Sequence, residues 1–193
     1  MLRELLGRYL LVNPCELRFT YNRYGKPALD RKLHAERLSF NLAHSGGLAL
    51  YAFTRDGEVG IDIEQLRDDL GSEEIARQFF SVEEITALTA LPEHLRTEGF
   101  FNCWTRKEAY IKAQGEGLSL SLQSFDVSLT PGEAALLLAT RDDPQEASRW
   151  SMRALLPGEG YAAALVVEGV GDYRVKCWQR PGDSQHVSGR SEL

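Results

Sequence analysis

Residues 100–112 read FFNCWTRKEAYIK and place an acid, two lysines and a tryptophan within one predicted helix. At 3.6 residues per turn, Trp104, Glu108 and Lys112 lie along one stripe of that helix, and Lys107 borders it. An ion pair between Glu108 and Lys112 on a solvated face explains the acid and the lysine but not the tryptophan beside them. The stripe also fits one wall of a site that holds a metal ion and an anion.

A second pair of acids stands in the segment EVGIDIEQL at residues 58–66. Its alternation predicts a strand, in which Asp62 and Glu64 project from one face, while Ile61 and Ile63 project from the other. Carboxylates this close raise each other's pKa, and a divalent cation removes the conflict. Magnesium prefers one or two carboxylates together with phosphate oxygens. The alternative is a strand end with two solvated acids.

Two further side chains of interest stand in predicted turns. Lys26 lies in YGKP at residues 24–27, and His44 lies in NLAHS at residues 41–45, where a predicted strand ends. Turn lysines are usually solvated and lone histidines are more often structural than functional, so neither residue indicates a site on its own.

The composition excludes several classes of protein. A formal net charge of -6 argues against a general nucleic-acid binder, which would be basic. The three cysteines form no CxxC pair, so neither a zinc site nor a disulfide framework is expected. The chain opens with charged residues among its leucines, unlike a signal peptide, and contains no apolar run of the roughly 20 residues that span a membrane. We therefore expect a cytoplasmic protein without nucleic-acid or membrane partners.

Hydrophobic periodicity divides the chain into helical and strand-like segments. Helices are predicted over residues 2–10, 72–80, 81–91 and 93–115, the third of them opening with a capping box from Ser81 to Glu84. Strands are predicted after the Asn13–Pro14 turn, twice within 38–54, and over 58–66, 118–129, 135–139, 150–156 and 161–169. Residues 47–62 weakly resemble residues 160–173, which hints at two lobes of similar build. We expect a first lobe at 1–70, a second lobe at 71–178 and a disordered tail at 179–193.

Five segments, taken in order, identify a family. YGKPAL, FNLAHSGG, VGIDIE, FFSVEE and FFNCWTRKEAYIKAQGEGLSL together resemble the 4'-phosphopantetheinyl transferase superfamily, in its two-lobed surfactin-synthetase-activating branch. The pair of GIDIE at 60–64 and WTRKEAYIKAQG at 104–115 is the most specific part. The resemblance implies an α+β fold of two similar α/β lobes related by a pseudo-two-fold axis. It also implies that the first lobe is shortened at its N-terminus, since relatives carry a further strand before the helix at 2–10.

The resemblance also implies a reaction. Members of the family move the 4'-phosphopantetheine arm of coenzyme A onto a serine of an acyl or peptidyl carrier protein, with magnesium as cofactor. The other product is adenosine 3',5'-bisphosphate. Such a phosphoryl transfer depends mainly on positioning and on neutralising charge. Because both lobes belong to one chain, a monomer is the simpler expectation.

The roles of individual residues follow from the same resemblance. Asp62, Glu64 and Glu108 would hold the magnesium ion. Lys112 would contact the phosphates and stabilise the leaving group, and either Glu108 or Glu84 would remove the proton of the serine. The residues expected to contact coenzyme A, or to shape its site, are Lys26, His44, Trp104, Lys107 and Lys112.

Two alternatives remain open at the level of sequence. A related chain without catalytic activity would bind coenzyme A or a carrier protein and transfer nothing. A magnesium-dependent phosphoesterase would use the same carboxylates on water and release phosphopantetheine with no carrier present.

Overall fold

A computed structural model describes residues 1–30, 37–55, 57–67, 73–169, 171 and 173–180 of the chain. The helices are α1 (Leu2–Leu10), α2 (Glu73–Phe79), α3 (Val82–Ala90) and α4 (Glu93–Gln114), with 3-10 turns η1 (Gly117–Ser119), η2 (Leu122–Ser124) and η3 (Glu146–Arg149). The strands are β1 (Phe19–Tyr21), β2 (Pro27–Leu29), β3 (Ser39–Ser45), β4 (Leu48–Thr54), β5 (Val59–Gln65), β6 (Phe125–Val127), β7 (Leu137–Thr140), β8 (Trp150–Leu155) and β9 (Tyr161–Glu168). The predicted α+β class is confirmed.

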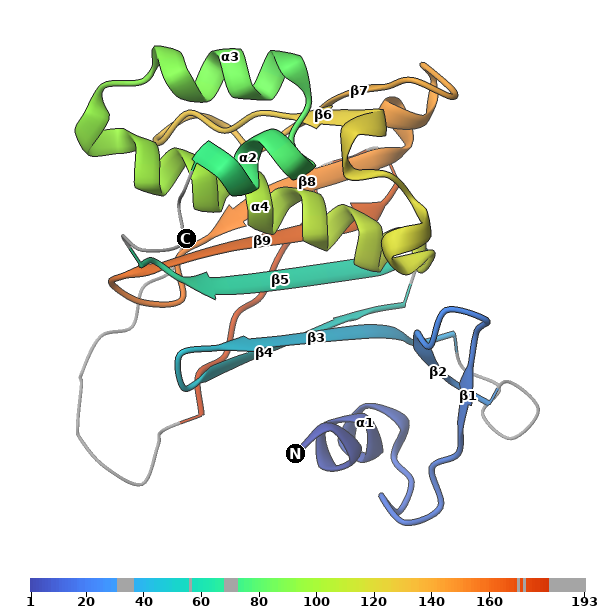
Figure 1. The fold of residues 1–193 in the computed structure, drawn as a ribbon. Coiled ribbons are helices and arrows are strands. Elements are labelled where there is room, and N and C mark those ends of the chain that lie inside the picture. Colours follow the sequence, from blue (N-terminus) through green and yellow to red (C-terminus); the bar gives the residue numbers. More distant parts are fainter. Residues whose placement is uncertain (31–36, 56, 68–72, 170, 172, 181–193) are drawn as a thin grey trace.

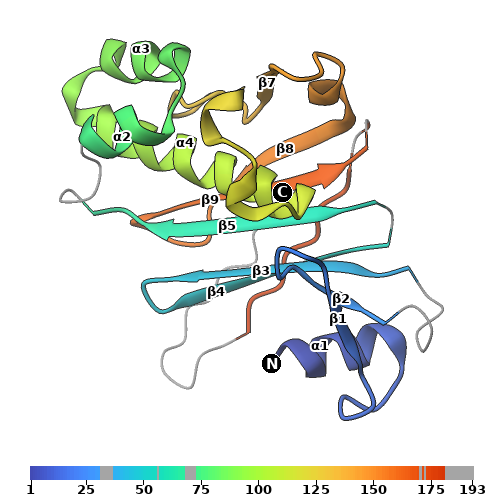
Figure 2. The ribbon, with the colours of Figure 1, turned by 45° about the vertical axis from the view of Figure 1, so that its right-hand side comes forward.

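A three-stranded antiparallel sheet in the order β5-β9-β8 forms the middle of the molecule. Strand β5 comes from the first half of the chain, and β8 and β9 come from its end. Figure 1 shows helices α2, α3 and α4 on one side of this sheet and the β3–β4 hairpin on the other, and Figure 2 shows the same layers. The two remaining strand pairs are β1–β2 and β6–β7.

Both faces of β5 are covered, so the strand is more buried than its alternating sequence predicts. Val59, Ile61 and Ile63 face the β3–β4 hairpin, in a core with alternate residues of β9. The opposite face packs against α4, and Asp62 is only 4% exposed there. A residue expected on a polar strand face therefore lies inside the protein.

Gly60 explains how closely α4 approaches β5. A Cβ atom at this position would collide with the carbonyl oxygen of Ala109 and the backbone nitrogen of Ala113. Because glycine has no side chain, the helix backbone rests directly on the strand. This close contact between helix and strand places side chains that are one turn apart on α4 next to Asp62 on β5.

Helix α4 is buried on most of its surface, and the exposed remainder is informative. Trp104, Glu108 and Lys112 are all only partly buried and follow one another along the predicted stripe, whereas the residues between them are buried. The helix begins after Pro92 and ends at Gly115, whose φ of 74° is the left-handed conformation that glycine favours. The sequence therefore predicts both the helix and its outward stripe.

The N-terminal part of the chain covers the far side of the β3–β4 hairpin. Leu6 of α1, Leu17 and Phe40 of β3 share a small core there. Tyr9 of α1 packs on Phe53 of β4, with ring centroids 4.9 Å apart. The hairpin is thus enclosed between α1 and the three-stranded sheet.

Most predicted elements are confirmed, and one is wrong over much of its length. Residues 118–129 form η1, η2 and only a three-residue strand, where the alternation of leucine and serine predicted a longer strand. Backbone bonds from Leu120 and Ser124 to residues three positions earlier close tight turns in this segment. The predicted lobe boundary at residues 70 and 71 and most of the predicted tail lie outside the described residues. The two-lobe division itself stays a prediction, and no helix in the described part of the chain could span a membrane.

Candidate functional site

An ion pair between helix and strand marks the centre of the candidate site. The ammonium nitrogen of Lys112 donates to Oδ1 of Asp62 at 2.6 Å. The lysine side chain is 31% exposed, whereas the carboxylate side chain is 6% exposed. The pair therefore opens to solvent on the side of Lys112 and is closed on the side of Asp62.

The second oxygen of Asp62 has no partner. Oδ2 is buried and accepts no hydrogen bond, the only buried side-chain polar atom without a partner among the described residues. Burial is the largest cause that raises the pKa of Asp62, from 3.8 to about 7, against the lowering effect of Lys112. A buried carboxylate oxygen without a partner is costly, so the arrangement fits a group that takes a cation or a proton.

Glu64 and Glu108 contribute negative charge around Asp62. Both carboxylates raise the pKa of Asp62 further. The pKa of Glu108 is itself raised, chiefly because of burial, with Lys112 opposing the shift and Glu64 adding to it. The pKa of Asp62 therefore depends on the charges of Glu64 and Glu108, and the pKa of Glu108 depends on the charge of Glu64.

The structure does not assemble these three acids into a formed metal centre. Within the described ranges, no three His, Cys, Asp or Glu side chains lie close enough to share a metal ion. Instead, Lys112 binds Asp62, and the Ser45 hydroxyl donates to Oε2 of Glu64 at 2.8 Å. The predicted ligand set of Asp62, Glu64 and Glu108 stays a prediction. The observation that fits it best is the unpartnered oxygen of Asp62.

His44 lies at the exposed end of β3, just before the turn at residues 46 and 47. Its neighbour Ser45 binds Glu64 and also accepts a bond from the backbone nitrogen of Gln65 at 3.1 Å. His44 directly precedes Ser45 on β3, and its expected contact with coenzyme A stays a prediction.

Lys26 lies at the other end of β5. Its ammonium group binds Oε2 of Glu58 at 2.7 Å and the carbonyl oxygen of Ala113 at 2.8 Å. Six residues of extended strand separate Glu58 from Glu64, which corresponds to about 20 Å. Lys26 is therefore engaged in holding the β1–β2 hairpin to the C-terminal end of α4, and a ligand would have to be long to contact both Lys26 and His44.

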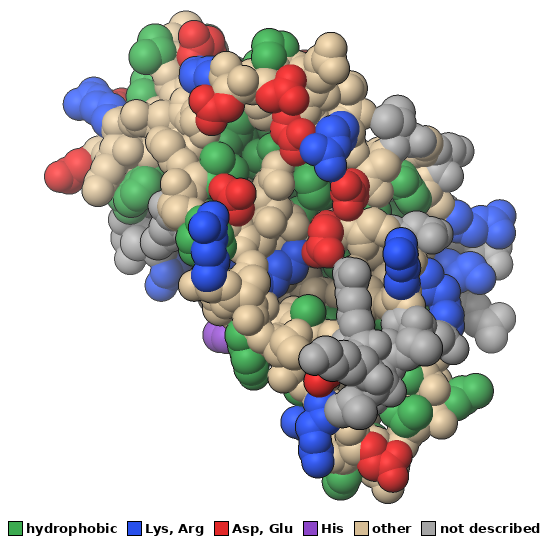
Figure 3. Space-filling model, turned by 90° about the vertical axis from the view of Figure 1, so that its right-hand side faces the viewer, with side chains coloured by type: hydrophobic (Ala, Val, Ile, Leu, Met, Phe, Trp, Pro, Cys, Tyr) green, Lys and Arg blue, Asp and Glu red, His purple; other side chains and the backbone are tan. Residues whose placement is uncertain are grey.

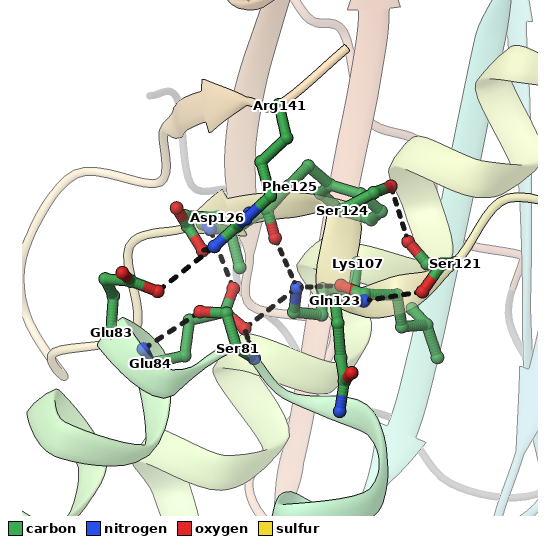
Figure 4. A network of polar contacts seen from close by, with 12 residues as sticks. Ser81, Glu83, Glu84, Lys107, Ser121, Gln123, Ser124, Phe125, Asp126 and Arg141 are labelled. Atoms are coloured by element: carbon green, nitrogen blue, oxygen red, sulfur yellow. Dashed lines mark hydrogen bonds and ion pairs between the residues drawn. The ribbon is translucent and has the colours of Figure 1, made fainter.

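Lys107 and Glu84 form a second lysine–carboxylate pair, which lies among Ser81, Phe125 and Asp126 (Figure 4). Their charged atoms are 2.8 Å apart, with exposures of 0% and 2%. Lys107 also donates to the carbonyl oxygens of Leu122 and Phe125, at 2.6 and 2.7 Å. The structure does not bring either residue to the Asp62 cluster, although the resemblance assigned both to the site.

Both oxygens of Glu84 are occupied within the protein. Oε2 accepts from the backbone of Ser81 and from Lys107, and Oε1 accepts from the backbone of Val127. The Ser81–Glu84 capping box is confirmed. A carboxylate enclosed in this way joins α3 to β6 and is poorly placed to remove a proton from a substrate.

Trp104 packs beside the stripe on α4. Its ring meets Phe79 edge-on, with centroids 5.5 Å apart, and stacks on Phe100 at 6.2 Å. The tryptophan thus fixes α2 against α4, in keeping with the expectation that it acts by packing.

Three residues that hold the site together were missed by sequence reasoning. Ser45 binds Glu64, Tyr161 donates its hydroxyl hydrogen to the carbonyl oxygen of Gly46, and Asn22 donates to the carbonyl oxygen of Gly115 at 2.6 Å. Tyr161 and Gly46 are 115 positions apart. No local pattern marks such bonds, because each one joins segments that meet only in the folded chain.

A surface pocket near the end of α4 has the wrong charge for a polyphosphate. It has a volume of about 220 Å³, and its lining includes Glu116, Asp142, Asp143 and Glu146. Figure 3 shows one face of the molecule. Acidic side chains lie over the upper half of this face, with lysines and arginines among them and at the edge of the face. Among the described residues, the lining of this pocket includes no lysine, arginine or histidine, so it offers no positive charge to an anionic ligand.

Comparison with known proteins supports the resemblance. A family model described as the 4'-phosphopantetheinyl transferase superfamily matches residues 58–166. The 4'-phosphopantetheinyl transferase HetI of Nostoc sp. is 39% identical over 178 residues, covering 92% of this chain and 71% of HetI. The 4'-phosphopantetheinyl transferase Sfp of Bacillus subtilis is 35% identical over 145 residues, covering 75% of this chain and 62% of Sfp. The chain thus spans between about three fifths and three quarters of these relatives' lengths.

One solved structure similar to this chain is the holo-[acyl-carrier-protein] synthase of Helicobacter pylori in complex with coenzyme A. It is 23% identical, with a TM-score of 0.44, and the match covers 57% of this chain and 99% of the synthase.

Proposed function

This chain belongs to the 4'-phosphopantetheinyl transferase superfamily, and we propose that it transfers the 4'-phosphopantetheine group of coenzyme A to a serine of an acyl or peptidyl carrier protein. Adenosine 3',5'-bisphosphate leaves as the second product. The observation that carries the proposal is the ion pair of the partly exposed Lys112 with the buried Asp62, whose second oxygen has no partner. Both residues lie within the segment that the family model matches.

Lys112 supplies the positive charge that the reaction requires. The serine oxygen forms a bond to the β-phosphorus of coenzyme A, and the bond from that phosphorus to the bridging oxygen breaks. Negative charge grows on the bridging oxygen as it leaves. The ammonium group of Lys112 is exposed enough to reach a phosphate, and Asp62 holds it in place beforehand, so little reorganisation is needed.

Glu108 is the better candidate for the base. Burial raises the pKa of its carboxylate, which brings it closer to the value at which a general base works best near neutral pH. It is only partly buried and lies one turn from Lys112 on α4. Glu84, in contrast, is enclosed by Ser81, Lys107 and Val127. We therefore assign the removal of the serine proton to Glu108 and a structural role to Glu84.

Magnesium fits the surroundings of Asp62. Oxygen ligands of carboxylates and phosphates are those that it prefers, and the unpartnered Oδ2 of Asp62 offers one such oxygen. Glu64 and Glu108 are the further residues that would hold it, together with the pyrophosphate of coenzyme A. When bound, the ion would neutralise charge on the pyrophosphate and on these acids. The pKa values of Asp62 and Glu108 are raised chiefly by burial and further by neighbouring carboxylates.

Three of the residues predicted to contact coenzyme A are not equally well placed to do so. His44 is exposed beside the carboxylate end of β5 and is retained as a contact to the nucleotide phosphates. Lys26 binds Glu58 and Ala113, so it contributes by fixing α4 and has one remaining donor for a ligand. Lys107 is fully buried and is not retained as a contact to coenzyme A.

Mass spectrometry of an apo carrier protein, incubated with this chain, coenzyme A and magnesium, tests the proposal. The carrier is expected to gain the mass of one phosphopantetheine group, and Asp62→Asn is the inactive control. Release of phosphopantetheine without a carrier would instead indicate a phosphoesterase. Binding of coenzyme A with neither outcome would indicate a non-catalytic relative.

A further inference from the structure

We propose that Tyr161 is a positioning residue that fixes the turn at Gly46 and Gly47 against the carboxylate end of β5, and that coenzyme A binding depends on this anchor. The inference rests on the proposed function, because that function assigns His44, at the end of β3 beside this turn, to the nucleotide. Tyr161 itself contacts backbone rather than substrate, so it acts through the turn.

The turn at residues 46 and 47, which joins β3 to β4, has a backbone that is easily displaced unless it is tied down. Gly46 and Gly47 adopt φ angles of 53° and 91°, in the left-handed region that glycine enters freely. Glycine pairs of this kind connect β3 to β4 without side chains that would lock them. His44 is exposed and lies two residues before Gly46, where it pairs with Ala49 at the end of the β3–β4 ladder.

Two anchors hold the turn, and they come from different strands. From β5, Glu64 accepts from the Ser45 hydroxyl at 2.8 Å, and the backbone nitrogen of Gln65 donates to the same hydroxyl at 3.1 Å. From β9, the Tyr161 hydroxyl donates to the carbonyl oxygen of Gly46. Gln65 and Tyr161 are direct partners in the β5–β9 ladder, so both anchors act at one end of the sheet.

The contact between Tyr161 and the turn is tight. A Cβ atom at Gly46 would lie 2.7 Å from the Tyr161 hydroxyl oxygen and would collide with the side-chain oxygen of Gln65. The backbone of the turn therefore rests directly on these two side chains. Since such an approach excludes any residue larger than glycine, Gly46 and Tyr161 form one complementary contact.

The two anchors are expected to affect different steps. Ser45 holds Glu64 and so acts on the proposed metal ligands, whereas Tyr161 holds the carbonyl group of Gly46, two residues beyond His44. Asp62, Glu108 and Lys112 are fixed by the packing of α4 on β5, which does not involve Tyr161. Loss of the Tyr161 hydroxyl should therefore weaken coenzyme A binding and leave the rate of the chemical step nearly unchanged.

Tyr161→Phe tests the proposal, and Tyr173→Phe is its matched control. The Tyr173 hydroxyl also donates to a backbone carbonyl, that of Glu168 at 3.1 Å, so this variant loses the same kind of bond away from the turn. Calorimetry should show the Kd for coenzyme A raised roughly 3- to 10-fold in Tyr161→Phe, the range for one neutral hydrogen bond, with kcat within about twofold of the original. Amide hydrogen exchange across residues 43–48 should become faster in this variant only.

Unchanged exchange in the turn, or equal changes in both variants, would overturn the anchor. Faster exchange with an unchanged Kd would overturn its link to coenzyme A. These results are separate from a failure of the proposed function, which the unaltered chain would reveal by binding coenzyme A without transferring phosphopantetheine. Gly46→Ala provides a second variant, expected to raise the Kd as well, because its Cβ would displace the turn from Gln65 and Tyr161.

Discussion

Two lysines of helix α4 form ion pairs with carboxylates, and the two pairs differ in their burial and in the hydrogen bonds of the carboxylate. Lys107 and Glu84 are 2.8 Å apart and almost fully buried. Lys112 and Asp62 are 2.6 Å apart, with the lysine partly exposed and the acid buried. Both oxygens of Glu84 are bonded to partners, whereas one oxygen of Asp62 has none.

The difference supports a structural role for the first pair and the proposed functional role for the second. A buried pair in which every polar atom has a partner specifies how α3, α4 and β6 fit together. A buried acid with an unpaired oxygen and a raised pKa costs stability, which favours the proposal that a ligand binds there. Two lysine–carboxylate pairs on one helix are therefore expected to have different roles, depending on whether every polar atom has a partner within the protein.

The largest effect is expected from Asp62→Asn. Transfer of phosphopantetheine should fall by on the order of 1000-fold or more, because the amide carries no charge with which to orient Lys112 or bind a cation. The thermal midpoint should stay the same or rise, since a buried charge is replaced by a neutral group. Carrier-protein mass spectrometry and calorimetry measure the two effects. A near-original rate at saturating magnesium would remove Asp62 from the site.

Lys107→Met should break the other pair and give the opposite result. Glu84 would remain buried without its cation, which is expected to lower the free energy of unfolding by about 3–5 kcal/mol. Urea denaturation measures the loss, and activity per folded molecule should be unchanged. The double variant with Glu84→Gln should recover part of the stability. A loss of activity without a loss of stability would place Lys107 in the site after all.

Lys112→Ala tests whether this lysine acts on the transition state. The value of kcat should fall roughly 100-fold, because the charge on the leaving oxygen is greatest in the transition state. The Kd for coenzyme A should change much less, since the ammonium group is one of several contacts. Steady-state kinetics and calorimetry separate the two quantities. An effect on the Kd alone would show that Lys112 binds the ground state only.

The raised pKa of Asp62 predicts a pH dependence of stability for the free protein. Burial raises this pKa from 3.8 to about 7, so between these values the folded chain holds a proton that the unfolded chain has released. Stability from this group is therefore present at low pH and is lost as the pH rises toward about 7. Urea midpoints measured across this window should fall less steeply in Asp62→Asn. Identical slopes in the two proteins would contradict the assignment.

The smallest effect is expected from Arg141→Ala, close to the buried structural pair. Arg141 binds Glu83 and Asp126, each at 3.0 Å, but its side chain is exposed (Figure 4). Solvent weakens such pairs, so the free energy of unfolding should fall by less than about 1 kcal/mol. Urea denaturation of Arg141→Ala and Lys107→Met, measured side by side, compares their free energies of unfolding. A loss as large as that of Lys107→Met would mean that burial does not set the difference between the pairs.

The local sequence predicted helices and strands well where hydrophobic periodicity or capping residues mark them. Helix α4 with its Gly115 end, the Ser81–Glu84 capping box and the outward stripe of α4 all follow from spacing within a few residues. The prediction was wrong for residues 118–124, which form 3-10 turns. Alternating leucine and serine suits a strand, but bonds between close neighbours along the chain formed turns instead.

The sequence by itself predicted the family and the α+β class through its resemblance to known proteins, and it marked Asp62, Glu108 and Lys112 as candidate site residues by their type and spacing. Only the tertiary structure decided which lysine meets which acid: Gly60 lets α4 rest on β5, and this contact pairs Lys112 with Asp62 while Lys107 points into the core with Glu84. Spacing along a helix fixes the direction of a side chain. Whether that direction leads to solvent, to a site or to a buried partner depends on chain segments far away in sequence.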